Sequence, residues 1–160
     1  MDFSLLNWRK SEVIFVLTLV LIIFGISSFQ LRISQMKTRD AQRKADVELV
    51  GRAVDAYYDD YEVYPASSVL GEIISCGRSG SEACEWGEGK IVDLDEVMYL
   101  SKLPIDPFAY KGYKYVYEVP ESRQSYRIYI ALEYKSDPAY KIDLTAKCGE
   151  KIQCNWYVEK

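Results

Sequence analysis

The chain has 160 residues and a formal net charge of −4. It contains no histidine, so the commonest general base and metal ligand near neutral pH is absent. The acidic balance argues against a nucleic-acid partner, and the sequence has neither a phosphate-binding loop nor a nucleophile beside a base, so an enzyme is the class it favours least.

An uncharged apolar run, Val13 to Leu31, occupies the amino-terminal region. Its length is close to the ~20 residues that a helix needs to cross a ~30 Å hydrocarbon core. A cleaved signal peptide is one alternative, but such signals have a shorter apolar region and a small-x-small site, which Gly25 and the nearby serines only imitate. A buried core helix is another, although basic residues on both sides favour a span. We predict a transmembrane helix over residues 13–31 after a short cytoplasmic stub, residues 1–12.

Four cysteines form two local pairs, Cys76 with Cys84 and Cys148 with Cys154, each around a short polar loop. Three connectivities exist, and we choose the local one. A zinc site is the alternative, but it prefers closer cysteine spacing with histidine. Two disulfides place residues 32–160 outside the cytoplasm, because disulfides persist in oxidising compartments.

Basic residues near the span indicate the opposite orientation. More of them follow the run than precede it, which favours a cytoplasmic carboxy-terminal domain; those that follow are Arg32, Lys37, Arg39, Arg43 and Lys44. We give the cysteines priority and expect a single-pass cell-membrane protein with a cytoplasmic amino terminus. The basic stretch can reach lipid headgroups from a helix leaving the membrane.

The helical pattern continues past the span, with no proline or glycine over residues 26–50. We predict one helix from about Leu5 to Tyr61, whose second half, residues 32–61, is amphipathic and ends before Tyr64-Pro65. Its apolar positions step by four along one face and continue on the adjoining one: Ala41, Ala45, Leu49, Ala53 and Tyr57, then Val50, Val54, Tyr58 and Tyr61.

The rest of the chain predicts a small antiparallel sheet. Residues 66–103 read as a disulfide-stapled loop region with a short helix over 93–103, and residues 111–160 as the sheet. One long helix on such a sheet is an α+β architecture. We interpret its many tyrosines as core packing, with a ligand-stacking surface as the alternative. The expected strands are 112–119 and 125–133 around a hairpin turn, then 139–144 and an edge at 156–158.

Several segments resemble the type IV pilins and the G-type pseudopilins of type II secretion systems. They are the amino-terminal apolar helix, Arg39-Asp-Ala-Gln-Arg-Lys-Ala-Asp46, Tyr57-Tyr-Asp-Asp-Tyr-Glu-Val-Tyr-Pro65 and Leu103-Pro-Ile-Asp-Pro107. The resemblance implies a non-enzymatic structural subunit, held in the membrane by its helix and drawn by inner-membrane assembly machinery into a filament of copies or related subunits. It does not choose among secretion, adhesion, motility and DNA uptake.

In this family a peptidase cuts after a glycine ahead of the apolar run, and a glutamate five residues into the mature chain sets the register of neighbouring subunits. Glu12 fits that glutamate if the mature chain begins at Trp8, where Asn7 replaces the glycine. In the other register Glu12 is the first mature residue, and Ser11 replaces the glycine. Neither restores the cleavage site, so we expect the stub to be retained. Glu12 is then either an assembly residue or an acid at the membrane boundary.

The charges on the second half of the helix have two interpretations. One is a solvated face with local pairs such as Asp40 with Lys44. The other is contact between subunits displaced along a filament, in which Arg39, Arg43 and Lys44 of one copy meet Asp55, Asp59 and Asp60 of the next.

We expect no cofactor. Some members of the resembled family hold calcium, but neither acidic cluster here has the alternating oxygen spacing and turn glycine of a calcium loop; the clusters are Asp93, Asp95 and Glu96, and Asp55, Asp59 and Asp60. The alternative function is an unprocessed, anchored domain that binds a partner through its disulfide loops and tyrosine-rich sheet and does not assemble.

Overall fold

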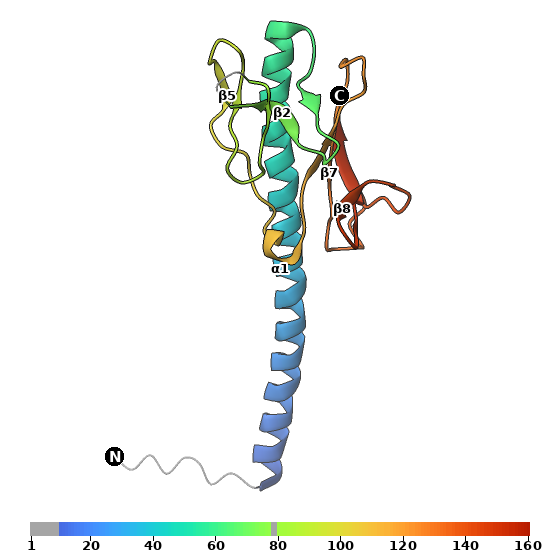
Figure 1. The fold of residues 1–160 in the computed structure, drawn as a ribbon. Coiled ribbons are helices and arrows are strands. Elements are labelled where there is room, and N and C mark those ends of the chain that lie inside the picture. Colours follow the sequence, from blue (N-terminus) through green and yellow to red (C-terminus); the bar gives the residue numbers. More distant parts are fainter. Residues whose placement is uncertain (1–9, 78–79) are drawn as a thin grey trace, which may run out of the picture. The chain divides into compact units, whose positions relative to one another are not determined.

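The computed structural model describes residues 10–77 and 80–160, and the chain falls into two compact parts, residues 1–37 and 38–160. A single helix, α1 (Lys10–Tyr61), contributes to both parts (Figure 1). The helix start predicted near Leu5 lies outside the described residues. The architecture is α+β, as predicted, with one long amino-terminal helix and small antiparallel sheets.

In the first part, α1 carries the apolar run with its side chains exposed. Phe15 is 68% exposed, and Leu21 and Phe24 are each 70% exposed. The hydroxyl of Thr18 donates a hydrogen bond to the backbone carbonyl of Ile14 at 2.8 Å, so this polar group is satisfied within the helix. By length and composition, this helix can span a membrane.

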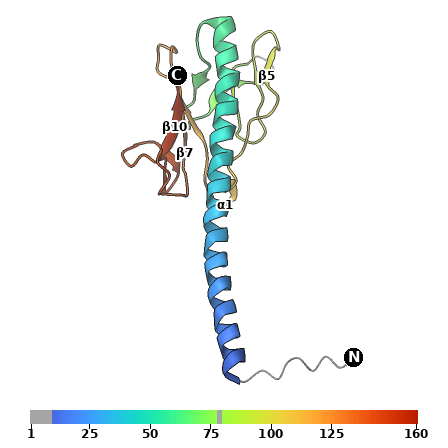
Figure 2. The ribbon, with the colours of Figure 1, turned by 180° about the vertical axis from the view of Figure 1, so that it is seen from behind.

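In the second part, α1 turns one face toward the core. Val47, Val50 and Val54 are completely buried and follow each other at helical spacing. Arg43 precedes them on the same face and is also completely buried. The predicted apolar face is therefore wrong at its start, since Ala41, Ala45 and Leu49 are exposed. Alanine fits either face, so its spacing could not choose between them. Figure 2 shows the side of the helix that no strand covers.

Two small sheets follow the helix in the chain. The first has the order β1-β2-β3, and the second pairs β4 with β5. All neighbours are antiparallel. The bounds are β1 Ala66–Ser67, β2 Ile73–Cys76, β3 Glu82–Ala83, β4 Ile91–Val92 and β5 Met98–Leu100.

The predicted helix over residues 93–103 is wrong, because β4 and β5 form a hairpin there. Asp93 explains the difference. Its Oδ1 accepts hydrogen bonds from the amides of Asp95 and Val97, both at 2.8 Å, and Glu96 takes a positive φ of 62°. These side-chain bonds stabilise a tight turn in place of a helical one.

The largest sheet lies in the carboxy-terminal region and has the order β10-β7-β6. Its strands are β6 Val116–Glu118, β7 Arg127–Ile130 and β10 Trp156–Glu159, all antiparallel. The predicted hairpin and the predicted edge at residues 156–158 are thus confirmed. A separate hairpin joins β8, Lys147–Gly149, to β9, Ile152–Gln153, and a short 3₁₀ helix, η1, spans Ala109–Lys111.

No strand forms over residues 139–144, where we predicted the third one. Asp137 bends the chain just before this segment: its Oδ1 accepts a hydrogen bond from the amide of Ala139, and its carbonyl accepts one from the amide of Tyr140. A turn of this kind competes with an extended strand.

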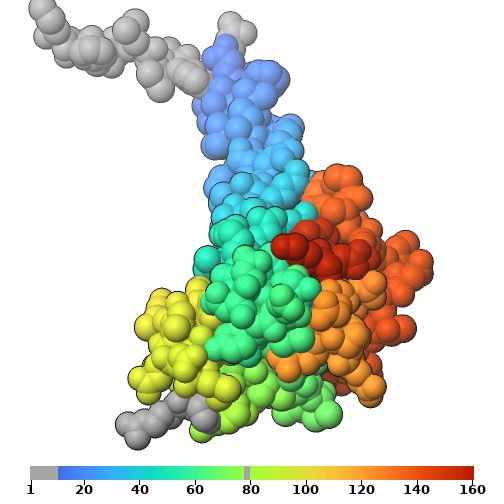
Figure 3. Space-filling model, turned by 90° about the horizontal axis from the view of Figure 1, so that it is seen from above, coloured from blue at the N-terminus to red at the C-terminus, as the bar shows by residue number. Residues whose placement is uncertain are grey.

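The core of the second part lies between α1 and strands on both flanks of the helix. Figure 3 shows these flanks on either side of the green helix end, one in yellow and the other in orange and red. Tyr115, Tyr117, Ile128 and Ile130 are completely buried in this core. Tyrosines in and next to the sheet therefore pack inside the domain, as expected, and each buries a large aromatic ring there.

Candidate functional site

A buried arginine forms the most densely connected polar site of the second part. Arg43 Nε donates to Asp106 Oδ2 at 2.8 Å, and Nη2 donates to Asp106 Oδ1 at 3.1 Å. The remaining nitrogen, Nη1, donates to Asp40 at 2.8 Å and to Glu133 at 2.7 Å. The Arg43 side chain has no exposed surface. All three nitrogens of the guanidinium are therefore bonded to carboxylates, which offsets the cost of burying the charge.

The carboxylates also bind loop backbone. Asp106 Oδ1 accepts a hydrogen bond from the amide of Phe108 at 2.7 Å. Asp40 accepts from the amides of Glu133 and Tyr134, both within 3.1 Å. The arginine and its partners thus fix two distant loops, residues 103–108 and 131–137, against one turn of α1. We call Arg43, Asp40, Asp106, Glu133 and Arg39 the Arg43 network.

Electrostatics in the network favour the ionised forms. Burial alone would lower the pKa of Arg43, but hydrogen bonds to Asp106 and Glu133 raise it overall. Burial alone would raise the pKa of Glu133, but hydrogen bonds from Arg39 and Arg43 hold it below its ordinary value. Arg43 and Glu133 are therefore fixed charges, suited to holding loops and unsuited to exchanging protons near neutral pH.

The structure corrects the predicted role of Arg43. The Arg43 side chain has no exposed surface, and its guanidinium already bonds to three carboxylates of its own domain. It is therefore not available to form an ion pair with a neighbouring subunit. Arg39 Nε and Nη2 bond to Glu133, each at 2.7 Å, and Lys44 Nζ bonds to Asp137 at 2.8 Å. The predicted local pair of Asp40 with Lys44 is wrong, because Asp40 forms its ion pair with Arg43 and Lys44 forms one with Asp137.

The acidic residues at the end of α1 lie at or near the surface. Asp55 accepts a hydrogen bond from the Tyr64 hydroxyl at 3.2 Å and lies 3.2 Å from Lys160 Nζ. Asp60 accepts one from the Tyr99 hydroxyl at 2.6 Å, and both Asp59 and Asp60 are exposed. Their role between subunits stays a prediction.

Glu12 lies in the first described turn of α1, and its residue is exposed. Residues 1–9, which include Asn7 and Trp8 of the first register, are outside the described part of the chain. Neither register of processing is therefore decided, and the assembly role of Glu12 stays a prediction.

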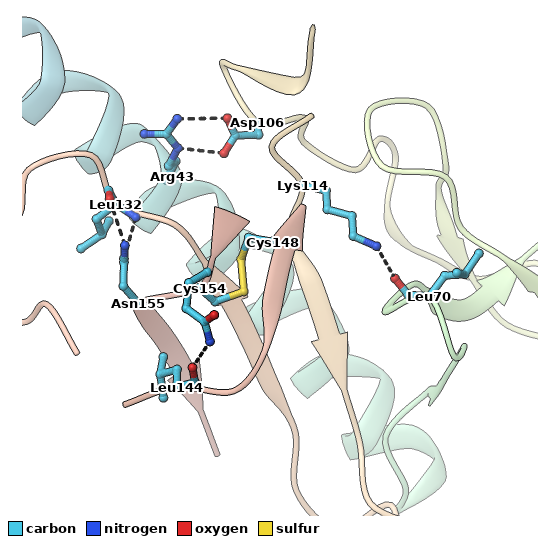
Figure 4. The surroundings of a disulfide bond; sticks show 10 residues. Arg43, Leu70, Asp106, Lys114, Leu132, Leu144, Cys148, Cys154 and Asn155 are labelled. Carbon is cyan, nitrogen blue, oxygen red and sulfur yellow. Dashed lines mark hydrogen bonds and ion pairs between the residues drawn. A yellow bond between two sulfur atoms is a disulfide. The ribbon is translucent and has the colours of Figure 1, made fainter. Parts of the chain in front are cut away.

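Both disulfides are present with the predicted connectivity, Cys76–Cys84 and Cys148–Cys154. Figure 4 shows the second one beside the polar contacts that hold its hairpin. Asn155, next to Cys154, accepts a hydrogen bond from the Leu132 amide at 2.7 Å and donates one to the Leu132 carbonyl at 3.0 Å. The hairpin is thus fastened to the chain that leads into the Arg43 network.

Within residues 10–77 and 80–160, no group of three or more acidic, histidine or cysteine side chains could hold a metal ion. In the first calcium candidate, Asp93 uses its carboxylate for the turn amides and for Tyr99. In the second, Asp55 and Asp60 bind tyrosine hydroxyls.

Sequence reasoning did not identify the acidic partners of Arg39, Arg43 and Lys44 on the distant loops, which are Asp106, Glu133 and Asp137. One signal was available: Asp106 lies inside the Leu103-Pro-Ile-Asp-Pro107 segment, where an acid between two prolines has little conformational freedom.

Comparison of the chain with protein-family models, with curated proteins and with solved structures gives no match. The function proposed below is therefore based on the sequence and the structure of this chain alone.

Proposed function

We propose that this chain is a membrane-anchored, pilin-like structural subunit of a type IV pilus or type II secretion-type filament. The apolar helix of one copy packs in the membrane, and then in the filament, against the helices of other copies or related subunits. The second part, residues 38–160, is displayed outside the cytoplasm. The resemblance of the helix and its exit segment to pilins motivates the proposal.

The observation that carries it is the exposure of the apolar run. Large side chains such as Leu21 and Phe24 have most of their surface uncovered within the chain itself. Burial of one such side chain is worth ~1.5–3 kcal/mol, so a run of them requires lipid or other helices. A helix that is apolar all round suits a membrane or a bundle core, and a subunit that moves from one to the other uses both.

The disulfides support the outward orientation. Both lie in the second part, and Cys84, Cys148 and Cys154 have no exposed surface. Bonds of this kind are rare in the reducing cytoplasm. Alkylation of the protein taken from its native membrane and denatured in the presence of the reagent, with and without prior reduction, tests the orientation. We expect no modified cysteine without reduction, and four modified thiols would reject the outward placement.

Photo-crosslinking in the native membrane tests assembly. A photoreactive residue in place of Leu21 should give a ladder of oligomers, because it faces neighbouring helices. The matched control replaces Ile142, which is 83% exposed in the second part, and it should give a weaker ladder or none. The alternative function, an anchored domain that does not assemble, gives monomers at both positions and rejects the filament proposal.

The intact mass of the same preparation addresses processing. A chain shortened by a few residues shows that a peptidase acts despite the missing glycine, whereas the full mass shows that the stub is retained. A full-length chain that still forms the ladder from position 21 would mean that assembly does not depend on cleavage.

A further inference from the structure

Three tyrosine rings meet where α1 ends. Tyr57 and Tyr61, one helical turn apart, stack with their ring centroids 4.7 Å apart and their planes at 26°. Tyr99, on β5, meets the Tyr57 ring edge-on, with centroids 5.5 Å apart. β5 lies beside the last turns of the helix (Figure 1). We call Tyr57, Tyr61 and Tyr99 the Tyr99 cluster.

Core packing explains only one ring of the Tyr99 cluster. In the part of the chain that the structure describes, Tyr99 packs against the buried core, whereas Tyr57 and Tyr61 do not belong to that core. All three residues keep part of their surface in solvent. Small molecules in solution can therefore reach the cluster.

The Tyr99 hydroxyl has proton acceptors in place. It donates a hydrogen bond to Asp60 Oδ2 at 2.6 Å and also contacts Asp93 Oδ2 at 3.0 Å. A tyrosine that loses an electron becomes a strong acid and must release its phenolic proton. A carboxylate within hydrogen-bond distance takes such a proton directly. Tyr99 is therefore arranged to lose an electron and a proton together.

The other stacked tyrosine pair lacks this combination. Tyr58 and Tyr64 have ring centroids 4.6 Å apart, but the Tyr58 hydroxyl donates to the amide oxygen of Gln124 at 2.9 Å, which is a poor proton acceptor. Tyr64 donates to the carboxylate of Asp55, but only 3% of its surface is exposed. Contact between rings, access and a carboxylate acceptor thus coincide in the Tyr99 cluster.

We propose that Tyr57 and Tyr99 are a site of oxidative coupling, at which one-electron oxidants, such as the radicals formed from hydrogen peroxide, join the two rings within one chain. Each ring gives one electron to the oxidant and releases its phenolic proton, Tyr99 to Asp60 and Tyr57 to water. A carbon–carbon bond forms between ring positions next to the hydroxyls, and the hydrogens on those carbons move to the oxygens. The net change is the loss of two hydrogen atoms.

The product would fasten β5 to the end of α1 by a covalent bond. The inference concerns the second part of the chain alone, and it depends neither on membrane anchoring nor on filament formation.

Oxidation of the full chain in detergent by light-activated ruthenium tris-bipyridine with persulfate tests the coupling. After reduction of the disulfides, trypsin places Tyr57 in the peptide 53–78 and Tyr99 in the peptide 91–102. Mass spectrometry should find these two peptides joined, with the loss of two hydrogens and the bond at Tyr57. The joined peptides should be several-fold less abundant after oxidation in urea, because unfolding separates the rings.

Two pairs of variants separate the site from its neighbours. Tyr57→Phe should abolish the joined peptides, whereas Tyr58→Phe, at the next position, should retain them. Asp60→Asn should lower their yield several-fold, because Tyr99 loses its closer proton acceptor, and the exposed neighbour Asp59→Asn should not. Near-ultraviolet circular dichroism checks that each variant keeps its fold.

An equal yield of joined peptides in urea, or in Tyr57→Phe, would overturn the inference, since contact between the two rings would then not decide the bond. Oxidation of a mixture of isotope-labelled and unlabelled chains supplies a further test. Joined peptides that carry one label each come from two chains, and their predominance would overturn coupling within one chain. The absence of joined peptides under conditions that oxidise other tyrosines would overturn it as well.

Discussion

Arg43 and Asp106 lie 63 positions apart in the sequence and meet through two parallel hydrogen bonds of 2.8 and 3.1 Å. The pair fastens the loop before η1 to the middle of α1. Both side chains are essentially inaccessible to solvent, with exposed fractions of 0% and 1%. A planar guanidinium matches a carboxylate at two points, which lysine cannot do.

Loss of Arg43 should therefore be severe. Arg43→Met keeps the length of the side chain but leaves Asp106, Asp40 and Glu133 without their shared cation. Breaking a buried ion pair in this way costs about 3–5 kcal/mol. Urea unfolding of the full chain in detergent, followed by the near-ultraviolet circular dichroism of its tyrosines and tryptophans, measures the loss.

The control is a pair of the same chemistry at the surface. Arg127 bonds to Glu159 at 2.8 Å, with side-chain exposures of 54% and 48%. Arg127→Met should leave the unfolding midpoint almost unchanged, because solvent screens exposed pairs. Equal losses in the two variants would show that burial of Arg43 contributes nothing to its effect.

Acid should weaken the domain through Glu133. The folded pKa of this carboxyl lies below its ordinary value of 4.5, so the unfolded chain binds the proton more readily. The stability it contributes is complete above about pH 5 and is lost as the pH falls through 4.5 toward the lowered folded pKa. Glu133→Gln should flatten this part of the stability curve. An identical slope in the variant would assign the acid sensitivity to other groups.

Each disulfide should contribute a similar amount to stability. The cysteines of each pair are 8 and 6 positions apart, and closing loops of this size is worth about 2–3 kcal/mol in the chain-entropy view. Cys76→Ser with Cys84→Ser, and separately Cys148→Ser with Cys154→Ser, should lower the free energy of unfolding by that amount. A negligible change in either double variant would show that packing alone holds that hairpin.

Gly71 and Gly112 allow a matched test of backbone strain. Both take positive φ, +80° and +83°, but a Cβ at Gly71 would lie 2.6 Å from Val116 Cγ1, whereas one at Gly112 meets nothing within 4 Å. Gly112→Ala should cost about 1–2 kcal/mol from the backbone conformation alone. Gly71→Ala should cost clearly more, measured by the same unfolding assay, and equal costs would rule out the contact with Val116.

The features that follow from local pattern could be read from the sequence. Continuous apolarity predicted a helix long and apolar enough to span a membrane, alternation predicted β6 and β7, and close spacing of Cys148 and Cys154 predicted their bond. The helix predicted over residues 93–103 does not form, because the Asp93 carboxylate accepts hydrogen bonds from the amides of Asp95 and Val97. These bonds stabilise a turn in place of the first turn of a helix. Local propensity does not include such a competing bond.

The Arg43 network could not be predicted in this way. Its carboxylates come from residues 40, 106 and 133, and only the folded chain brings them together. A charged residue on an amphipathic helix is normally placed on the solvent side, so Arg43 was assigned to the surface. Only knowledge of which loops cross the helix at that turn would have corrected the assignment.

The short span of each disulfide affects how the protein is made. A cysteine that finds its partner within 8 or 6 positions meets it as soon as that piece of chain reaches an oxidising compartment. Among the three ways of pairing four cysteines, the native one is then also the fastest to form, since a short loop closes sooner than a long one. Oxidation of this chain should need little reshuffling by an isomerase, because wrong pairs require ends that are still far apart.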